Sequence, residues 1–133
     1  LLMSLFGQLK ELLQTEPDLQ LAYLFGSAAT DRMRPDSDVD VAVAVSPRMD
    51  APRMMALIRR LSESIGRNID LVDLQQAHGT ILKEAMQGKE LFCRDYTVKE
   101  TLMKRLVYEQ EDFIPLRRSM LARRRQLELH GHE

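Results

Sequence analysis

The sequence predicts an α+β or α/β domain in which short strands are interspersed with helices and the C-terminal region is helical. Three observations predict it: apolar or alternating runs of strand length, helix-length segments with a helical apolar period, and a charged, helix-periodic C-terminal third. A chain of 133 residues corresponds to one domain. Its composition, 44% hydrophobic and 29% charged, is that of a globular protein and excludes a disordered or collagen-like chain.

The first four elements follow from hydrophobic periodicity and turn residues. Apolar residues at helical spacing over 2–13 predict an amphipathic helix. The apolar run 19–25 predicts a buried strand, and residues 28–33 predict a short helix. Residues 38–45 alternate strictly and form the clearest strand, with valines on one face and two aspartates and two alanines on the other.

The next four elements alternate between helix and strand. Residues 54–65 and 80–87 predict helices, and each of them is followed by a glycine that ends it. Residues 68–74 and 89–94 predict the third and fourth strands. We therefore expect a sheet of about four strands.

The C-terminal region is predicted to be helical. A Thr-x-x-Glu capping box at Thr97 starts a helix that reaches about Gln110, and a last, Arg-rich helix follows a break at 112–115. We therefore divide the chain into a core over 1–95 and C-terminal helices over 96–133 that extend the same domain. The local basic charge fits a solvated helix face or a docking surface for an acidic partner, and fits a nucleic-acid site less well because aromatic residues are not interleaved with it.

Charge and cysteine content exclude several classes of protein. The chain has 19 Lys and Arg against 20 Asp and Glu, and a net charge of -1 does not favour direct nucleic-acid binding. The single cysteine, Cys93, excludes an internal disulfide and a four-cysteine zinc site and indicates a cytoplasmic protein. No apolar run approaches the ~18 residues of a membrane span, and residues 1–8 lack the basic start of a signal peptide.

Asp38 and Asp40 are the sharpest chemical feature of the sequence. Because strand side chains alternate, both carboxylates lie on one face, roughly 7 Å apart at the backbone. Two like charges ~4 Å apart repel by about 4 kcal/mol at an effective dielectric near 20, so a cation between them would stabilise the pair. Carboxylate oxygens suit Mg²⁺ or Mn²⁺. The alternative is a solvent-facing strand that carries two charges.

Two further features accompany the aspartate pair. The Gly26-Ser27 turn ends the preceding strand and can present N–H groups and a hydroxyl to a phosphate, although such a dipeptide also serves as a plain turn. A third carboxylate is expected from strand 68–74, where Asp70 and Asp73 face opposite sides. We favour Asp70, which lies mid-strand, over Asp73, which lies near the strand end and can cap the next helix or meet solvent.

These residues resemble the nucleotidyltransferase superfamily that includes DNA polymerase β. Gly26-Ser27, ten intervening residues and Asp38-Val39-Asp40 read GSx10DxD, the form typical of the minimal nucleotidyltransferases, the MntA-like antitoxins encoded beside HEPN-domain toxins. The resemblance covers residues 19–95. It implies a small nucleotidyltransferase fold with a mixed sheet of about four strands flanked by helices, and it makes 96–133 a partner-docking extension.

The resemblance also implies a role for each motif residue. Gly26 and Ser27 correspond to the turn that holds the nucleotide triphosphate, and Asp38 and Asp40 correspond to two metal ligands. Asp70 corresponds to the third carboxylate, which ligates the catalytic metal and helps to activate the attacking hydroxyl.

One departure from the family pattern concerns the arginines. Many relatives carry Arg-Gly shortly after the Gly-Ser turn, where this chain has Thr30-Asp31. Arg32 or Arg34 is then expected either to meet the triphosphate in its place or to serve as a plain surface residue.

The implied reaction is an adenylyl transfer. ATP binds with two Mg²⁺ ions, a hydroxyl attacks the α-phosphate in line, and pyrophosphate leaves. In MntA-like antitoxins the acceptor is a tyrosine hydroxyl of the cognate HEPN ribonuclease toxin, which forms a hetero-oligomer with the antitoxin and is neutralised by AMPylation.

Other functions remain open at this point. They are a small-molecule nucleotidyltransferase of the aminoglycoside type, which usually has a larger C-terminal domain, and an antitoxin that neutralises by binding alone, against which the three carboxylates argue. A toxin that adds nucleotides to tRNA fits less well, because such proteins are larger and more basic.

Overall fold

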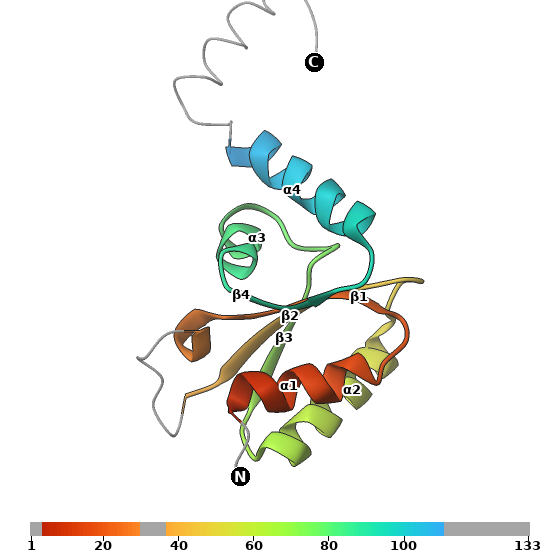
Figure 1. The fold of residues 1–133 in the computed structure, drawn as a ribbon, viewed down its shortest axis with the longest axis vertical. Coiled ribbons are helices and arrows are strands. Elements are labelled where there is room, and N and C mark those ends of the chain that lie inside the picture. The colour runs from red at the N-terminus through yellow and green to blue at the C-terminus, as the bar shows by residue number, and fades with distance from the viewer. Residues whose placement is uncertain (1–3, 30–36, 111–133) are drawn as a thin grey trace, which may run out of the picture.

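The computed structural model describes residues 4–29 and 37–110, and these residues form four α-helices, one short 3-10 helix and four strands (Figure 1). In chain order the elements are α1 (Leu5–Gln14), β1 (Leu19–Phe25), the 3-10 helix η1 (Gly26–Ala29), β2 (Val39–Val45), α2 (Ala51–Ile65), β3 (Ile69–Asp73), α3 (Gly79–Met86), β4 (Lys89–Cys93) and α4 (Tyr96–Gln110).

The four strands form one sheet with the order β3-β2-β1-β4. β1 lies inside the sheet and pairs antiparallel with both β2 and β4, while β2 pairs parallel with β3. The C-terminal end of β1 and the N-terminal ends of β2 and β3 therefore meet at one end of the sheet. The predicted α+β class with a mixed four-stranded sheet is confirmed.

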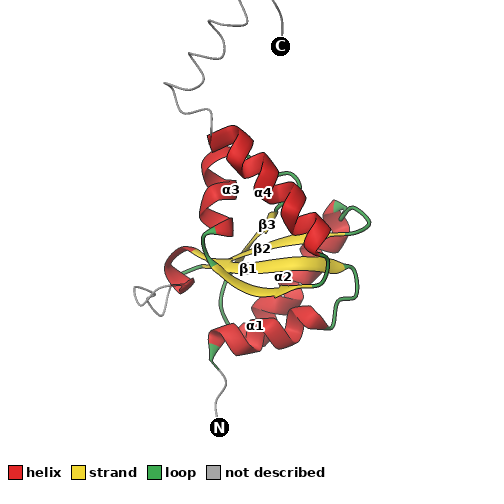
Figure 2. Cartoon of the chain, turned by 45° about the horizontal axis from the view of Figure 1, so that its top comes forward, coloured by secondary structure: helices red, strands yellow, loops and turns green. Residues whose placement is uncertain are grey.

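Helices cover both faces of the sheet, α1 and α2 on one side and α3 and α4 on the other (Figures 1 and 2). The alternation of β2 explains this layering, because valines make one face of the strand apolar and alanines make the other face apolar. The four valines pack against α1 and α2, for example against Leu61. Ala42 and Ala44 pack on the opposite side with Leu82 and Leu102. The predicted division of β2 into a valine face and an aspartate-alanine face is confirmed.

The helix predicted over 54–65 begins three residues earlier, at Ala51. The Asp50 side chain caps it, since its Oδ1 accepts the N–H of Arg53 at 2.9 Å. Pro52 lies in the first turn, where the N–H that proline lacks has no helical partner. The sequence-based boundary was therefore wrong because a proline near a helix start was read as a loop residue.

The helix predicted to start with a capping box at Thr97 is capped differently. α4 begins at Tyr96, and Asp95 Oδ1 accepts the N–H of Thr97 at 2.9 Å. A carboxylate at this position both satisfies a free N–H and carries a favourable charge for the helix dipole. The cap therefore comes from Asp95, two residues before the threonine.

Two predicted helices lie partly or wholly outside the residues that the structure describes. Of the short helix predicted over 28–33, only the start is covered, and there η1 already begins at Gly26. The Arg-rich helix predicted after 112–115 lies outside the described residues. Within 4–29 and 37–110, no helix combines the length and the apolar character needed to cross a membrane.

Candidate active site

The candidate site lies at the end of the sheet where β1 ends and β2 and β3 begin. Asp40 is the second residue of β2, and its Cα partners are Phe25, the last residue of β1, and Asp70, the second residue of β3. Gly26 follows Phe25 directly. Strand pairing thus brings the predicted phosphate turn and two of the predicted aspartates together from three separate stretches of the chain.

Side-chain alternation puts Asp40 and Asp70 on the face of the sheet that α3 and α4 cover. Asp38 stands just before β2, two residues from Asp40, and is exposed. Asp73 has the opposite parity to Asp70 on β3, and its Oδ1 accepts the N–H of Gln75 at 3.0 Å in the turn after the strand. The structure therefore places Asp70, and not Asp73, beside Asp40.

Gly26 lies directly against the Asp40 carboxylate. Its φ is +70°, a left-handed conformation that favours glycine, and a Cβ added to it would stand 2.2 Å from Asp40 Oδ2. A side chain at this position would push the carboxylate away. The glycine of the Gly-Ser motif therefore fixes the contact between the turn and the carboxylate, while Ser27 follows it half-buried in η1.

The surroundings of Asp40 raise the pKa of its carboxyl group. Burial is the largest cause, followed by the charge of Asp70, a side-chain hydrogen bond with Asp70, and then the charges of Asp38 and Glu84. Glu84 comes from α3 and was not among the predicted site residues. Its position depends on how α3 packs over the sheet, which no spacing in the sequence reveals.

The donor chemistry of Asp40 and Asp70 fits a hard divalent cation, which would also relieve the like-charge repulsion that, after burial, contributes to the raised pKa of Asp40. Nowhere in the described part of the chain, however, are three or more His, Cys, Asp or Glu side chains gathered so as to hold one metal ion. Asp38 is near enough to act on Asp40 through its charge but does not complete such a group. Arg32 and Arg34, the predicted triphosphate contacts, lie outside the described residues.

A comparison with protein families agrees with this site geometry. The family model described as polymerase beta, nucleotidyltransferase matches residues 7–97, well over half of the chain. The chain belongs to this nucleotidyltransferase family. The matched region contains the Gly-Ser turn and all three candidate aspartates, and it ends as α4 begins.

The chain is also similar to individual proteins and to solved structures. It is 35% identical over 77 residues to the protein adenylyltransferase MntA of Shewanella oneidensis, a match that spans 57% of this chain and only 55% of that protein. A chain in a crystal structure of a toxin–antitoxin with AMP-PNP superposes with a TM-score of 0.69 at 28% identity, covering 89% of this chain and 96% of its own length.

Two further solved structures are similar over most of their length. A chain of the MntA-HepT toxin–antitoxin complex gives a TM-score of 0.62 at 27% identity, with 88% of this chain and 93% of the other covered. A chain of the tri-AMPylated Shewanella oneidensis HEPN toxin in complex with MNT antitoxin gives 0.55 at 27% identity, with 92% and 91% covered.

α4 is packed onto the core and holds the connection between β3 and α3. Leu102 is buried in the α3–α4 side of the core. Arg105 Nη1 donates to the carbonyl oxygens of Leu74, Gln75 and Ala77 at 3.4, 3.2 and 3.1 Å. Residues 96–110 are thus part of the same packed unit as the strands.

Glu109, near the end of α4, caps the N-terminus of α3. Its Oε1 accepts the N–H of Gly79 at 2.8 Å, and its Oε2 lies 2.9 Å from His78 Nδ1. These two contacts, the Gly79 N–H first, hold the pKa of Glu109 below its ordinary value. Sequence reasoning could not identify this role of Glu109, because a cap from another helix leaves no local signal.

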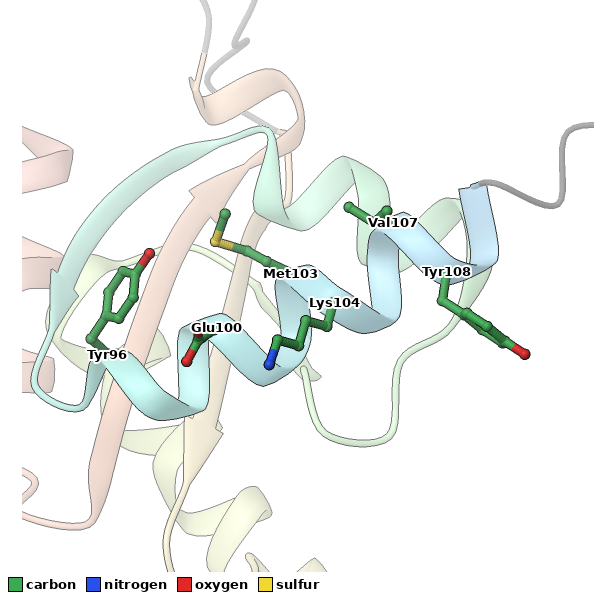
Figure 3. Close-up of a pocket in the computed structure, with 6 residues that line it drawn as sticks. All are labelled: Tyr96, Glu100, Met103, Lys104, Val107 and Tyr108. Atoms are coloured by element: carbon green, nitrogen blue, oxygen red, sulfur yellow. The ribbon is translucent and has the colours of Figure 1, made fainter.

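The outer face of α4 carries a shallow groove lined by residues at helical spacing (Figure 3). Its lining residues are Tyr96, Glu100, Met103, Lys104, Val107 and Tyr108. Four of these, the two tyrosines, the methionine and the valine, are exposed large apolar residues, and elsewhere in the described residues only Met55 and Ile81 are. A concentration of exposed apolar side chains on one helix face is typical of an interaction surface.

Proposed function

We propose that this nucleotidyltransferase transfers AMP from ATP to a hydroxyl group of a protein, and that the protein is a cognate HEPN-domain toxin. The observation that carries the proposal is the pairing of Asp40 with Asp70 on adjacent strands, with Gly26 against Asp40 at the same end of the sheet. The likeness to the adenylyltransferase MntA and to chains solved with AMP-PNP or with an AMPylated HEPN toxin supports the transferred group and the partner.

The proposal gives each site residue a role. Backbone N–H groups and the hydroxyl of the Gly26-Ser27 turn bind the triphosphate, with Arg32 or Arg34 as a further contact. Asp38, Asp40 and Asp70 would hold Mg²⁺, which supplies Lewis-acid stabilisation of the charge on the α-phosphate and the leaving group.

The acceptor oxygen, which we propose to be that of a tyrosine, forms a bond to the α-phosphorus. The bond from that phosphorus to the oxygen bridging to the β-phosphate breaks, and pyrophosphate leaves. Asp70 receives the hydroxyl proton, as a carboxylate within reach of the acceptor can act as general base. The AMP that is added brings a negative charge to the toxin, which would disfavour RNA in the active site of a ribonuclease.

Residues 96–133 are proposed to dock the toxin, and the exposed apolar groove of α4 supports this assignment. An enzyme that modifies a folded protein needs such a surface in addition to its nucleotide site. We also propose that the protein acts in the cytoplasm, where thiols stay reduced, and its single cysteine supports this location.

A transfer assay tests the proposal. The protein is incubated with Mg²⁺, α-labelled ATP and a co-purified or neighbouring HEPN-domain protein, and the products are weighed by intact mass, with the D38A/D40A double variant as control. AMP on a tyrosine of the partner, absent with the double variant, is the expected result. Pyrophosphate release without a labelled partner would instead indicate a small-molecule acceptor, and co-elution without either product would indicate neutralisation by contact alone.

A further inference from the structure

We propose that Gly88 is a positioning residue of the site, because it allows the turn between α3 and β4 to brace the end of β1. The inference deepens the proposed function and rests on it for its nucleotide, but the contact itself is independent of any substrate.

The approach of the two segments is close enough to require glycine. A Cβ added to Gly88 would stand 2.4 Å from the carbonyl oxygen of Leu24, 2.7 Å from Phe25 Cβ and 3.0 Å from Phe25 Cα. Two of these atoms belong to the backbone of β1 and the third is a Cβ, so none can rotate away. Any side chain at position 88 therefore has to displace either the turn or the strand end.

The displaced strand end is the segment on which the site is built. Phe25 is the cross-strand partner of Asp40, and Gly26 follows it with its own close approach to the Asp40 carboxylate. On the other edge of β1, Lys89 pairs with Leu24 directly after the turn. The end of β1 is thus held between β2 and the α3–β4 turn. The position of Gly26, the next residue, therefore depends on both contacts.

From the sequence, the glycine after 80–87 is predicted only to end a helix. Gly88 does lie in that position, and its N–H donates to the carbonyl oxygen of Ala85 at 3.1 Å. No left-handed φ is required of it, in contrast to Gly66, so helix termination alone does not demand glycine there. The close contact with β1 is what requires glycine at position 88, and such a contact can be seen only in the folded chain.

The test compares Gly88→Ala with Gly79→Ala. Gly79 has a φ of +57° and nothing within 4 Å of an added Cβ, so its substitution strains the start of α3, the end of that helix opposite Gly88, without overlap. We expect Gly88→Ala to shift the amide NMR signals of Gly26, Ser27 and Asp40 in the absence of nucleotide. We also expect it to weaken binding of AMP-PNP with Mg²⁺, measured by calorimetry, on the order of tenfold or more, since site geometry is sensitive to shifts below 1 Å. Gly79→Ala should lower the melting temperature and change neither readout.

The outcomes separate the inference from the proposed function. A folded Gly88→Ala variant with the site signals and AMP-PNP affinity of Gly79→Ala would overturn the bracing role. If the unmodified protein does not bind AMP-PNP, the proposed function fails, and the amide signals of Gly88→Ala still decide the role of Gly88. If Gly88→Ala does not fold, hydrogen exchange of the unmodified protein decides: AMP-PNP should slow exchange at the Gly88 amide, and an unchanged rate there beside slower exchange at Gly26 would overturn the inference.

Discussion

The two faces of the sheet are covered by different types of side chain. The face under α1 and α2 is an aliphatic core in which leucines such as Leu13 and Leu61 are fully buried against the valines of β2. The face under α3 and α4 has small residues in the centre of β2 and ionisable groups toward its margins. At one margin the Tyr23 hydroxyl donates to Glu90 at 3.3 Å, and at the other Asp40 meets Asp70.

The difference shows how a small domain can hold clustered carboxylates. Burial and like charges raise the pKa of Asp40, so ionising it in the folded protein costs free energy. The aliphatic face contributes the burial that offsets this cost, at roughly 25 cal/mol per Å² of apolar surface removed from water. Stability and chemistry are therefore expected to respond separately to substitutions on the two faces.

The largest effect is expected for Asp40→Asn. We predict that the transfer rate falls on the order of 10³-fold, about 4 kcal/mol of barrier, because a ligand for the metal and its charge are lost. Rates are to be measured with labelled ATP and the HEPN partner. A variant that keeps more than a tenth of the activity would show that Asp40 is not a catalytic residue.

Asp40→Asn should also leave the metal-free protein at least as stable as the unmodified one at neutral pH. Because the pKa of Asp40 is raised in the folded state, its ionisation destabilises the fold above that pKa, and stability is regained as the pH falls through it. Melting temperatures in EDTA should therefore differ at neutral pH and converge in acid. A variant that melts lower at neutral pH would contradict this sign.

Leu61→Ala tests the other face. The side chain is fully buried against the valines of β2, so its truncation should lower the free energy of unfolding by about 3 kcal/mol. Urea denaturation measures the loss, and the transfer rate per folded molecule should stay within about twofold, because the site lies on the opposite face. A large loss of activity in the folded variant would mean that the two faces are coupled.

A comparison of Asp70→Asn with Asp73→Asn tests which aspartate of β3 is the third carboxylate of the site. We expect the first to reduce turnover on the order of 10²-fold, because it removes a general base and ligand. The second keeps an oxygen that can accept the Gln75 N–H and removes only the charge, so it should leave turnover within about twofold and change stability by less than about 1 kcal/mol. The reverse order of activities would transfer the third-carboxylate role to Asp73.

The smallest effect is expected for Glu109→Gln, which removes the charge that caps α3. It should cost about 1 kcal/mol of stability at neutral pH. Because the pKa of Glu109 is lowered in the folded protein, the stabilisation is present above the ordinary glutamate pKa and is lost as the pH falls through the lower folded value. The two proteins should therefore differ in melting temperature at pH 7 and agree in strong acid, whereas a difference that persists in acid would contradict the charge-based explanation.

The strands were predictable because their signal is local. Strict alternation in β2 placed Asp38 and Asp40 on one side, and the parity of Asp70 against Asp73 chose the carboxylate that the structure puts beside Asp40. The Gly-Ser turn could be located for the same reason, since it directly follows an apolar strand.

The remaining features depend on contacts between distant segments. Glu84 acts on Asp40 only because Leu82 and Ala85 set the face that α3 turns toward the sheet. Gly88 is distinguished from an ordinary helix end only by its distance to β1. A sequence pattern reports the period of an element, but not the neighbour that its polar face will meet.

The central position of β1 has a consequence for biosynthesis. β1, β2 and β3 are complete once residues 19–73 have been made, whereas β4, the other neighbour of β1, begins only at Lys89. Until then β1 has an open hydrogen-bonding edge beside an uncovered apolar surface, a combination that invites pairing with other chains. Translation that stalls in the interval between β3 and β4 is therefore expected to yield nascent chains that aggregate or depend on chaperones.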